Sequence, residues 1–219
     1  MSAKYPRTSH LPYSPGGTDD DRRIKTVSHF LGRPIVITEK MDGSNLCMTS
    51  KDIFARSHSG PPTHPSFDRA KARWSEIRHL IDDHLNLFNE WCYARHSIPY
   101  TALPDFMLLF GVREHRDTWW SWDEVEFMAQ VLGVPTVPVL WKGSVATAAE
   151  LEKIVTHIAG QISACGGDRE GVVVRVADRI IQKDWERSIA KWVRADHVQT
   201  DDHWTHGVVV PNILKSCQS

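Results

Sequence analysis

The chain has 219 residues, 41% of them hydrophobic and 24% charged, which is the composition of a globular domain with a sizeable core. No run is apolar and long enough to cross a bilayer, and the N-terminus lacks the apolar segment of a secretory signal. The cysteines form no C-x-x-C pair, which argues against a disulfide framework or a zinc site and fits a reducing cytoplasm. They are Cys47, Cys92, Cys165 and Cys217.

The net charge of −1 is a mild argument against a nucleic-acid partner, because binding to a phosphate backbone relies on Lys and Arg. Net charge is less informative for an enzyme that must also hold carboxylates for a metal ion. In such an enzyme, local patches of charge matter more than the total.

The first part of the chain is predicted to form an arm, three strands and a helix. Residues 1–24 are rich in Pro, Gly, Ser and Asp, which predicts an extended N-terminal arm. Residues 58–66 form a predicted loop, and apolar residues at spacings of three and four predict one helix over 68–91. Short apolar and β-branched runs predict strands at 34–40, 45–50 and 53–57.

In the rest of the chain, helices and strands alternate. Ser121 and Thr147 each stand three residues before a glutamate, a capping box that predicts a helix start. The first helix is expected to stop at Gly133 and the second to run to about Ser163. Further strands are predicted at 106–112, 136–141, 171–176 and 189–194. Hairpins mixed with helices predict an α+β fold with largely antiparallel sheets, in a single domain over 1–219.

The sharpest local feature is the segment EKMDGSN at residues 39–45, which places Lys40 where a hydrophobic strand ends and a turn begins. A lysine held in a cleft is partly desolvated, which favours the neutral, nucleophilic amine. Asp42 could steer this amine or hold water on a metal ion, and Gly43 allows close approach to the backbone. K-x-D-G occurs by chance in roughly one chain in twenty of this size, so a surface hairpin with a solvated lysine is the alternative.

K-x-D-G followed by Asn45 and a strand resembles motif I of the covalent nucleotidyltransferases, which include ATP-dependent DNA ligases, RNA ligases and mRNA capping enzymes. Arg56 resembles the motif Ia arginine, and the alternative is a surface salt bridge. Glu90 resembles the glutamate of a Gly-Glu segment, with Asn89 in place of the glycine, or is a surface carboxylate at a helix end.

The stretch ARHSIPYTALPDFMLLFGVRE resembles the RNA ligase 2-like branch. In it, Phe110 occupies the motif III position, where a flat ring covers the adenine, and core packing is the alternative. Glu170 begins a motif IV-like run, or is an edge-strand charge. Lys191 resembles the first motif V lysine, while Val193 fills the second lysine's position and Arg194 follows it. The alternative for this segment is a basic edge strand.

These segments occur in the family's order, so the resemblance implies an ATP-dependent RNA ligase with a nucleotidyltransferase (ATP-grasp-like) fold. Lys40 is implied to attack ATP and carry AMP, which then passes to a 5′-phosphate end and leaves when a 3′-hydroxyl attacks. Mg²⁺ is implied to be held by Asp42, Glu90 and Glu170, in part through water, and Mn²⁺ is expected to substitute. The implied nucleotide contacts are Glu39, Lys40, Asn45, Arg56, Glu90, Phe110, Glu170 and Lys191, with Arg194 as a further phosphate contact.

Other functions stay open within and beyond this resemblance. DNA ligases and capping enzymes share these motifs but usually carry an OB-fold domain after motif V, and only 25 residues follow Arg194 here. We therefore expect a stand-alone domain that acts on RNA ends, which raises the question of a partner for end healing (a kinase or phosphatase) or RNA grip. A non-catalytic RNA-end or nucleotide-binding module of the same fold is the alternative from another class.

Two further groups of side chains are notable. The predicted helix carries basic residues that could face RNA, or that simply form a solvated surface. They are Arg69, Lys71, Arg73 and Arg78. His203 and His206 could suggest a metal site, but without a third ligand in view a structural role is expected.

Overall fold

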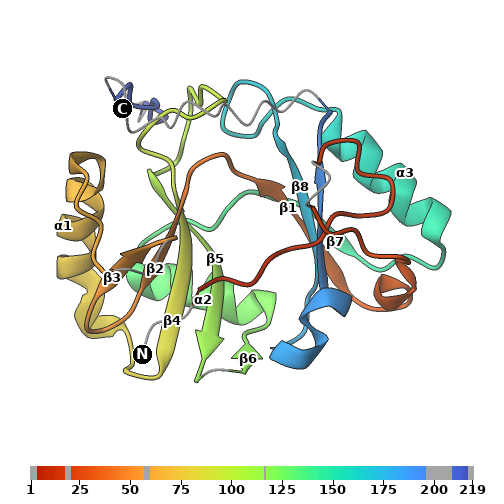
Figure 1. Cartoon of the computed structure of the whole chain (residues 1–219), viewed down its shortest axis with the longest axis horizontal. Helices are drawn as coiled ribbons and strands as arrows, with labels where there is room; N and C mark the ends of the chain where they lie inside the picture. Colours follow the sequence, from red (N-terminus) through yellow and green to blue (C-terminus); the bar gives the residue numbers. More distant parts are fainter. Residues whose placement is uncertain (1–3, 18–20, 57–59, 116, 196–208, 217–219) are drawn as a thin grey trace.

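A computed structural model describes residues 4–17, 21–56, 60–115, 117–195 and 209–216 (Figure 1). The four-stranded sheet consists, in order, of β10 (Ile189–Val193), β8 (Gly171–Val176), β1 (Ile35–Lys40) and β7 (Val139–Gly143). The six-stranded sheet consists of β3 (Ile53–Ala55), β2 (Ser44–Met48), β4 (Leu85–Trp91), β5 (Met107–Glu114), β6 (Thr118–Trp119) and β9 (Ile180–Ile181). Neighbouring strands in both sheets pair antiparallel, which confirms the predicted α+β fold.

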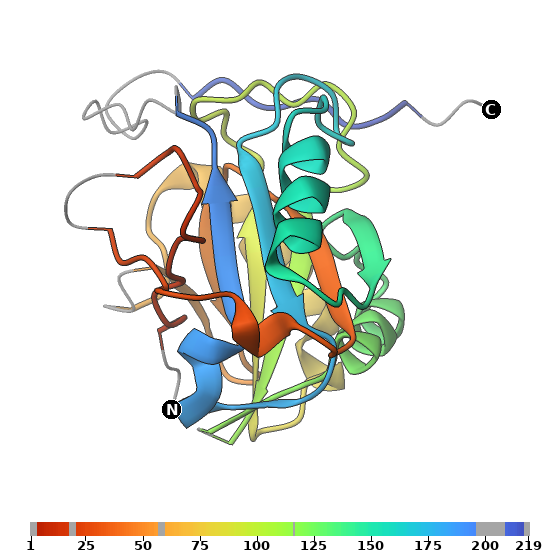
Figure 2. The same cartoon turned by 90° about the vertical axis from the view of Figure 1, so that its right-hand side faces the viewer.

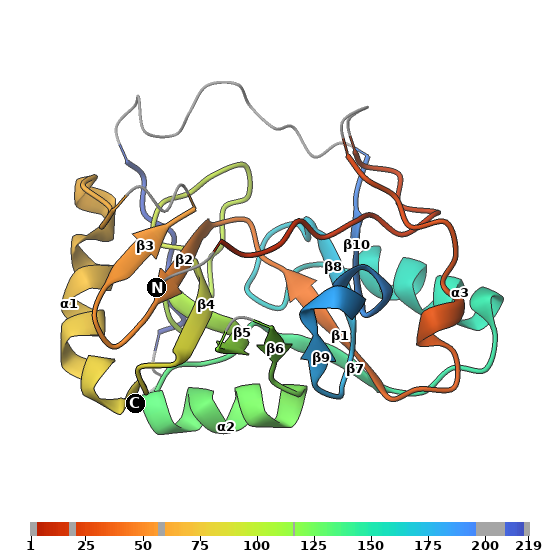
Figure 3. The same cartoon turned by 60° about the horizontal axis from the view of Figure 1, so that its bottom comes forward.

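Three helices flank the sheets. They are α1 (Asp68–Ile77), α2 (Trp122–Leu132) and α3 (Ala148–Ala159). Helices α1 and α3 lie at opposite ends of the molecule (Figure 1), and α3 covers the four-stranded sheet (Figure 2). Helix α2 runs along the six-stranded sheet (Figure 3). Short 3-10 turns complete the chain: η1 (Ser28–Phe30), η2 (Pro65–Phe67), η3 (Arg78–Leu80) and η4 (Gln182–Arg187).

The inner strands β2 and β4 of the six-stranded sheet pack on a different hydrophobic cluster at each face. Leu46 and Leu87 belong to the cluster that includes residues of α1 and α2. Their strand neighbours Cys47 and Phe88 belong to the second cluster, which includes residues of the four-stranded sheet and α3. Successive side chains on a strand point to opposite faces, so the second cluster joins the two sheets.

Helix α2 begins as the sequence predicts. The Ser121 hydroxyl accepts the Glu124 N–H, the Glu124 carboxylate accepts the Ser121 N–H, and Gly133 ends the helix at a φ of 61°. Thr147 caps α3 in a related way, but the Glu150 side chain accepts the N–H of Ala146 instead. Helix α3 ends at Ala159, four residues before the predicted end near Ser163, and Gly160 is its C-cap.

The prediction of one helix over 68–91 was wrong in its second half. Helix α1 ends at Ile77, and residues 85–91 form β4, an inner strand of the six-stranded sheet. All residues of β4 except Glu90 are buried. Because the strand is buried on both faces, it lacks the alternation of apolar and polar residues, and its apolar residues at 85, 88 and 91 recur at threes, as on one face of a helix.

The N-terminal arm lies along the free edge of β10 and crosses toward the six-stranded sheet (Figure 3). The Leu11 N–H donates to the Lys191 carbonyl at 2.8 Å, and the Lys191 N–H donates to the Ser9 carbonyl at 2.9 Å. The backbone of His10 also hydrogen-bonds Arg22 and Ile24, so residues 22–24 lie beside the arm on the side away from β10. The arm therefore extends the four-stranded sheet without forming a regular strand.

Within the described residues, no helix combines the length and the apolar composition needed to cross a membrane. Cys47, Cys92 and Cys165 are buried free thiols, whereas Cys217 lies outside the described residues, as do His203 and His206.

Candidate active site

The centre of the site is formed where β1 ends and β8 begins. Lys40 is the last residue of β1 and pairs with Gly171, so Glu170 directly precedes its partner. The Lys40 ammonium contacts the Glu170 carboxylate, and the two side chains are 28% and 3% exposed. Gly171 is required here, because a Cβ at this position would lie 2.0 Å from the Trp192 carbonyl oxygen.

Lys40 is held in its charged form. Burial alone would lower the pKa of Lys40, but Glu170, Glu90 and Asp42 outweigh it and raise the pKa above its ordinary value. This differs from the expectation that desolvation favours the neutral amine. The carboxylates must therefore be compensated by another cation before Lys40 can act as a nucleophile.

Glu90 joins this cluster from β4. It pairs with Asn45 of β2, and its Oε1 accepts the N–H of Gly43 at 3.1 Å. Burial raises the pKa of Glu90 to about 8, and Glu170 and Asp42 add to the rise while Lys40 opposes it. The rise is therefore mainly the cost of burying this carboxylate, with a smaller contribution from the neighbouring carboxylates.

Asp42 is fixed by the segment that follows β4. Its Oδ2 accepts the backbone N–H groups of Ser97 and Ile98 at 2.8 and 2.9 Å. Its own N–H donates to the Tyr100 hydroxyl at 2.8 Å. Residues 96–100 (HSIPY), in the stretch that resembles the RNA ligase 2-like branch, therefore orient the aspartate of the K-x-D-G turn. Gly43 packs closely there, since a Cβ would lie 2.7 Å from the Trp91 carbonyl oxygen.

Lys191 approaches the cluster from β10. It pairs with Val173, which pairs with Thr38, so Lys191 and Lys40 share one face of the four-stranded sheet. Its Nζ lies 3.5 Å from Asp21 Oδ1. Burial lowers the pKa of Lys191, and Lys40 lowers it further. Two lysines on one face of the sheet can both contact one polyanionic ligand.

Arg194 is engaged outside this group. Its Nη1 lies 3.0 Å from Asp168 Oδ2, while its backbone N–H donates to the Glu170 carbonyl at 3.1 Å.

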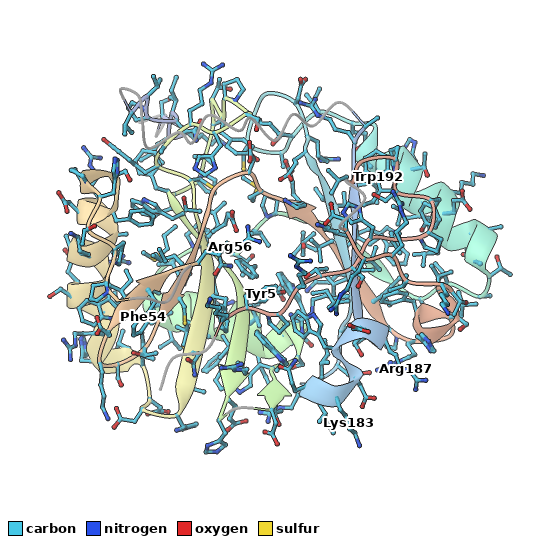
Figure 4. The ribbon with its side chains drawn as sticks, viewed as in Figure 1. Tyr5, Phe54, Arg56, Lys183, Arg187 and Trp192 are labelled. Atoms are coloured by element: carbon cyan, nitrogen blue, oxygen red, sulfur yellow. The ribbon has the colours of Figure 1, made fainter. Side chains whose placement is uncertain are left out.

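Arg56 and Phe110 flank the site on the six-stranded sheet. Arg56 is exposed and directly follows β3, one position beyond the Leu46–Ala55 pair, which places it beside Asn45. Figure 4 shows Arg56 and Tyr5 in the middle of the molecule. Phe110 is half-buried on β5, and its ring meets the ring of Tyr5 edge-on at 5.0 Å.

Glu39 does not join the cluster. Its side chain is buried on the other face of β1, where Oε2 lies 3.5 Å from Arg169 Nη2 and accepts the Ala164 N–H at 2.9 Å. Asn89 also serves the framework, because it is fully buried where the β4–β5 register shifts.

The basic residues of the predicted RNA-facing helix contact other parts of the chain. Lys71 lies 2.7 Å from Asp68, and Arg73 reaches Glu76 and the carbonyls that end α2. Arg69 and Arg78 lie over the rings of Tyr93 and Trp74.

Sequence patterns gave no indication of three arm residues that the structure brings to the site, Tyr5, His10 and Asp21. His10 is buried and hydrogen-bonds Ser14 at 2.9 Å. Burial lowers the pKa of His10 to about 4, and Lys191 also lowers it while Asp21 opposes the shift. Isolated polar residues in an irregular arm follow no period, so only the three-dimensional structure places them.

Comparison with known proteins identifies the family. The model of the RNA ligase family matches residues 33–193, most of the chain. The chain therefore belongs to the RNA ligase family. No curated protein sequence matches the chain.

Solved structures agree with this assignment. An archaeal ATP-dependent RNA ligase is similar with a TM-score of 0.53 and 17% identity, over 87% of this chain and 48% of that chain. A Naegleria gruberi RNA ligase mutant with ATP and Mn is similar with a TM-score of 0.55 and 15% identity, over 89% of this chain and 61% of that chain. These similarities show the nucleotidyltransferase fold of RNA ligases, and the chain spans about half to three fifths of those proteins.

Proposed function

We propose that this chain is the adenylyltransferase domain of an ATP-dependent RNA ligase that joins 5′-phosphate and 3′-hydroxyl ends. The observation that carries the proposal is the contact between Lys40 and Glu170 at the adjoining ends of β1 and β8. Glu90 and Lys191 lie close enough to influence the charge of this pair. A nucleophile, carboxylates and a second cation are the groups that nucleotidyl transfer requires.

In the first step, neutral Lys40 attacks the α-phosphorus of ATP. The N–P bond forms as the bond to pyrophosphate breaks, and the nitrogen loses a proton. Lys191 stabilises the negative charge on the phosphate oxygens, with Arg56 or Arg194 as the second cation. Phe110 covers the adenine with its half-buried ring. AMP then passes to the 5′-phosphate end, and attack by the 3′-hydroxyl seals the RNA and releases AMP.

The donor set fits a divalent cation. Asp42, Glu90 and Glu170 all lie close enough to Lys40 to raise its pKa, so three carboxyl groups gather around this one amine. In the described ranges no three His, Cys, Asp or Glu side chains are arranged to hold a metal ion directly, so the proposal has water complete the coordination of the ion. When bound, Mg²⁺ or Mn²⁺ would neutralise the phosphate oxygens and the carboxylates that hold Lys40 in its charged form.

The test is incubation with ATP labelled at the α-phosphate and Mg²⁺, followed by a denaturing gel. The wild-type chain and Lys51→Ala, an exposed lysine in the β2–β3 turn, should retain the label, and Lys40→Ala should not. Label that survives in Lys40→Ala would exclude Lys40 as the nucleophile. Label from GTP but not ATP would favour a capping-type enzyme, and none from either would favour a non-catalytic RNA-end-binding module.

A ligation panel then tests the substrate. RNA and DNA ends are offered in nicked and single-stranded form, and we expect sealing of RNA. Sealing of DNA alone would identify a DNA ligase. Adduct formation without sealing would support a partner that supplies end healing or RNA grip.

A further inference from the structure

The N-terminal arm reaches the phosphate side of the site through Asp21. Its two carboxylate oxygens contact different residues: Oδ1 lies 3.5 Å from Lys191 Nζ, and Oδ2 lies 3.5 Å from His10 Nε2. The side chains of Lys191 and Asp21 are 19% and 24% exposed. Both are therefore partly removed from water, where an ion pair holds its geometry better than on an open surface.

His10, whose ring lies beside this carboxylate, is itself held firmly in the arm. It is 1% exposed, and its Nδ1 is 2.9 Å from the Ser14 hydroxyl. Its backbone N–H donates to the Arg22 carbonyl at 2.7 Å, and its carbonyl accepts the Ile24 N–H at 2.9 Å. The arm is thus fixed to β10 on one side and to the chain that carries Asp21 on the other.

We propose that Asp21 is a positioning residue for Lys191, so that the N-terminal arm completes the phosphate end of the nucleotide site. This inference rests on the proposed function, in which Lys191 contacts the phosphate. Three successive contacts connect Ser14 to His10, His10 to Asp21, and Asp21 to Lys191. None of the three arm residues belongs to the motifs by which the sequence resembles its family.

Asp21 can hold Lys191 without blocking it. A lysine ammonium has three donors on a flexible stem, so one donor can remain on Asp21 while the others meet phosphate oxygens. Fixing the stem lowers the entropy lost when the cation meets the transition state. Asp21 therefore acts mainly on the rate of adenylylation and less on the binding of ATP.

The experiment measures lysyl-AMP formation in a single turnover as a function of ATP concentration. Asp21→Asn should lower the rate at saturating ATP by about tenfold, with a much smaller change in the ATP concentration that gives half the maximal rate. Glu186→Gln is the matched control, because Glu186 also pairs with the arm, 3.2 Å from Arg22, but at an exposed site. It should leave the rate unchanged.

A double-variant cycle distinguishes positioning from a structural role. In the Lys191→Ala background, Asp21→Asn should cause no further loss, since the residue it positions is absent. Asp21→Glu, which keeps the charge, should retain more of the rate than Asp21→Asn. Equal rates for Asp21→Asn and wild type, or full losses from Asp21→Asn in both backgrounds, would overturn the inference. A wild-type chain without any adduct would instead refute the proposed function.

Discussion

Glu39 and Arg169 form a buried ion pair, with 3.5 Å between Oε2 and Nη2 and side chains that are at most 3% exposed. Each residue directly precedes a member of the Lys40–Glu170 contact. Arg169 also donates to the carbonyl of Ile158 near the end of α3. The pair therefore ties the ends of β1 and β8 to the helix behind them, on the face of the sheet opposite the site.

Breaking this pair should strongly destabilise the fold. Arg169→Met leaves the Glu39 carboxylate buried without its cation, which should cost about 3 to 5 kcal/mol of unfolding free energy. The double variant Glu39→Leu with Arg169→Met should recover part of that loss, because no charge is left buried. Urea unfolding followed by circular dichroism measures both. A loss from Arg169→Met no larger than that from Arg33→Met, whose exposed pair with Asp178 spans 3.9 Å, would contradict the prediction.

The Tyr100 hydroxyl should matter for both stability and the first reaction step. It accepts the Asp42 N–H at 2.8 Å and is buried. Tyr100→Phe leaves that N–H without its acceptor, which should cost about 1 to 3 kcal/mol, and it loosens the turn that carries Lys40. Lysyl-AMP formation should fall accordingly.

Tyr13→Phe is the control for this variant. The buried Tyr13 hydroxyl has no hydrogen-bond partner within the part of the chain that the structure describes, so its removal should be neutral or stabilising. Equal effects of the two variants on unfolding and on adduct formation would show that the contact with Asp42 is unimportant.

The sequence predicted the two strands whose ends carry Lys40 and Glu170 more accurately than it predicted the strands that support them. Lys40 and Glu170 follow and precede β-branched runs, which identified β1 and β8 correctly. Strand β4 was mistaken for a helix because it is buried on both faces. The assignment of Glu90 to the site therefore rested on family resemblance alone. The predicted helix end would have placed its carboxylate elsewhere than the inner strand does.

The role of the arm could not be predicted for a different reason. His10 and Asp21 are eleven positions apart in an irregular segment, and they meet Lys191 only because the arm pairs with the edge of β10. Edge pairing depends on backbone groups rather than side chains, so it leaves no pattern in the sequence. Glu39 shows the converse, since its neighbour Lys40 is in the site while its own side chain faces the opposite way.

The charge state of Lys40 can be tested without ATP. Glu170 is the strongest of the groups that raise the pKa of Lys40 against the opposing effect of burial. Glu170→Gln removes this charge, so more Lys40 should be neutral at pH 8 and react faster with an amine-selective reagent. Peptide mass spectrometry without metal measures the labelling, with exposed Lys51 as the internal reference. An unchanged ratio of Lys40 to Lys51 labelling would show that Glu170 does not control this amine.

The stability of the arm should depend on pH through His10. Burial lowers the pKa of His10 from 6.5 to about 4, helped by Lys191, Arg23 and Lys40 and opposed by Asp21. Between these values the unfolded chain binds a proton that the folded chain does not, so stability is present above pH 6.5 and is lost as the pH falls toward 4. From pH 7 to pH 5 the expected contribution is a loss of about 2 kcal/mol.

His10→Asn isolates this contribution, because asparagine keeps a polar group near Ser14 but does not titrate. Carboxylates titrate in both proteins, so the relevant quantity is the difference between their losses of unfolding free energy from pH 7 to pH 5. Urea unfolding at the two pH values should show a loss about 2 kcal/mol larger for the wild-type chain. Equal losses would mean that His10 can take up a proton in the folded arm, so that a neutral, buried imidazole is not what supports Asp21.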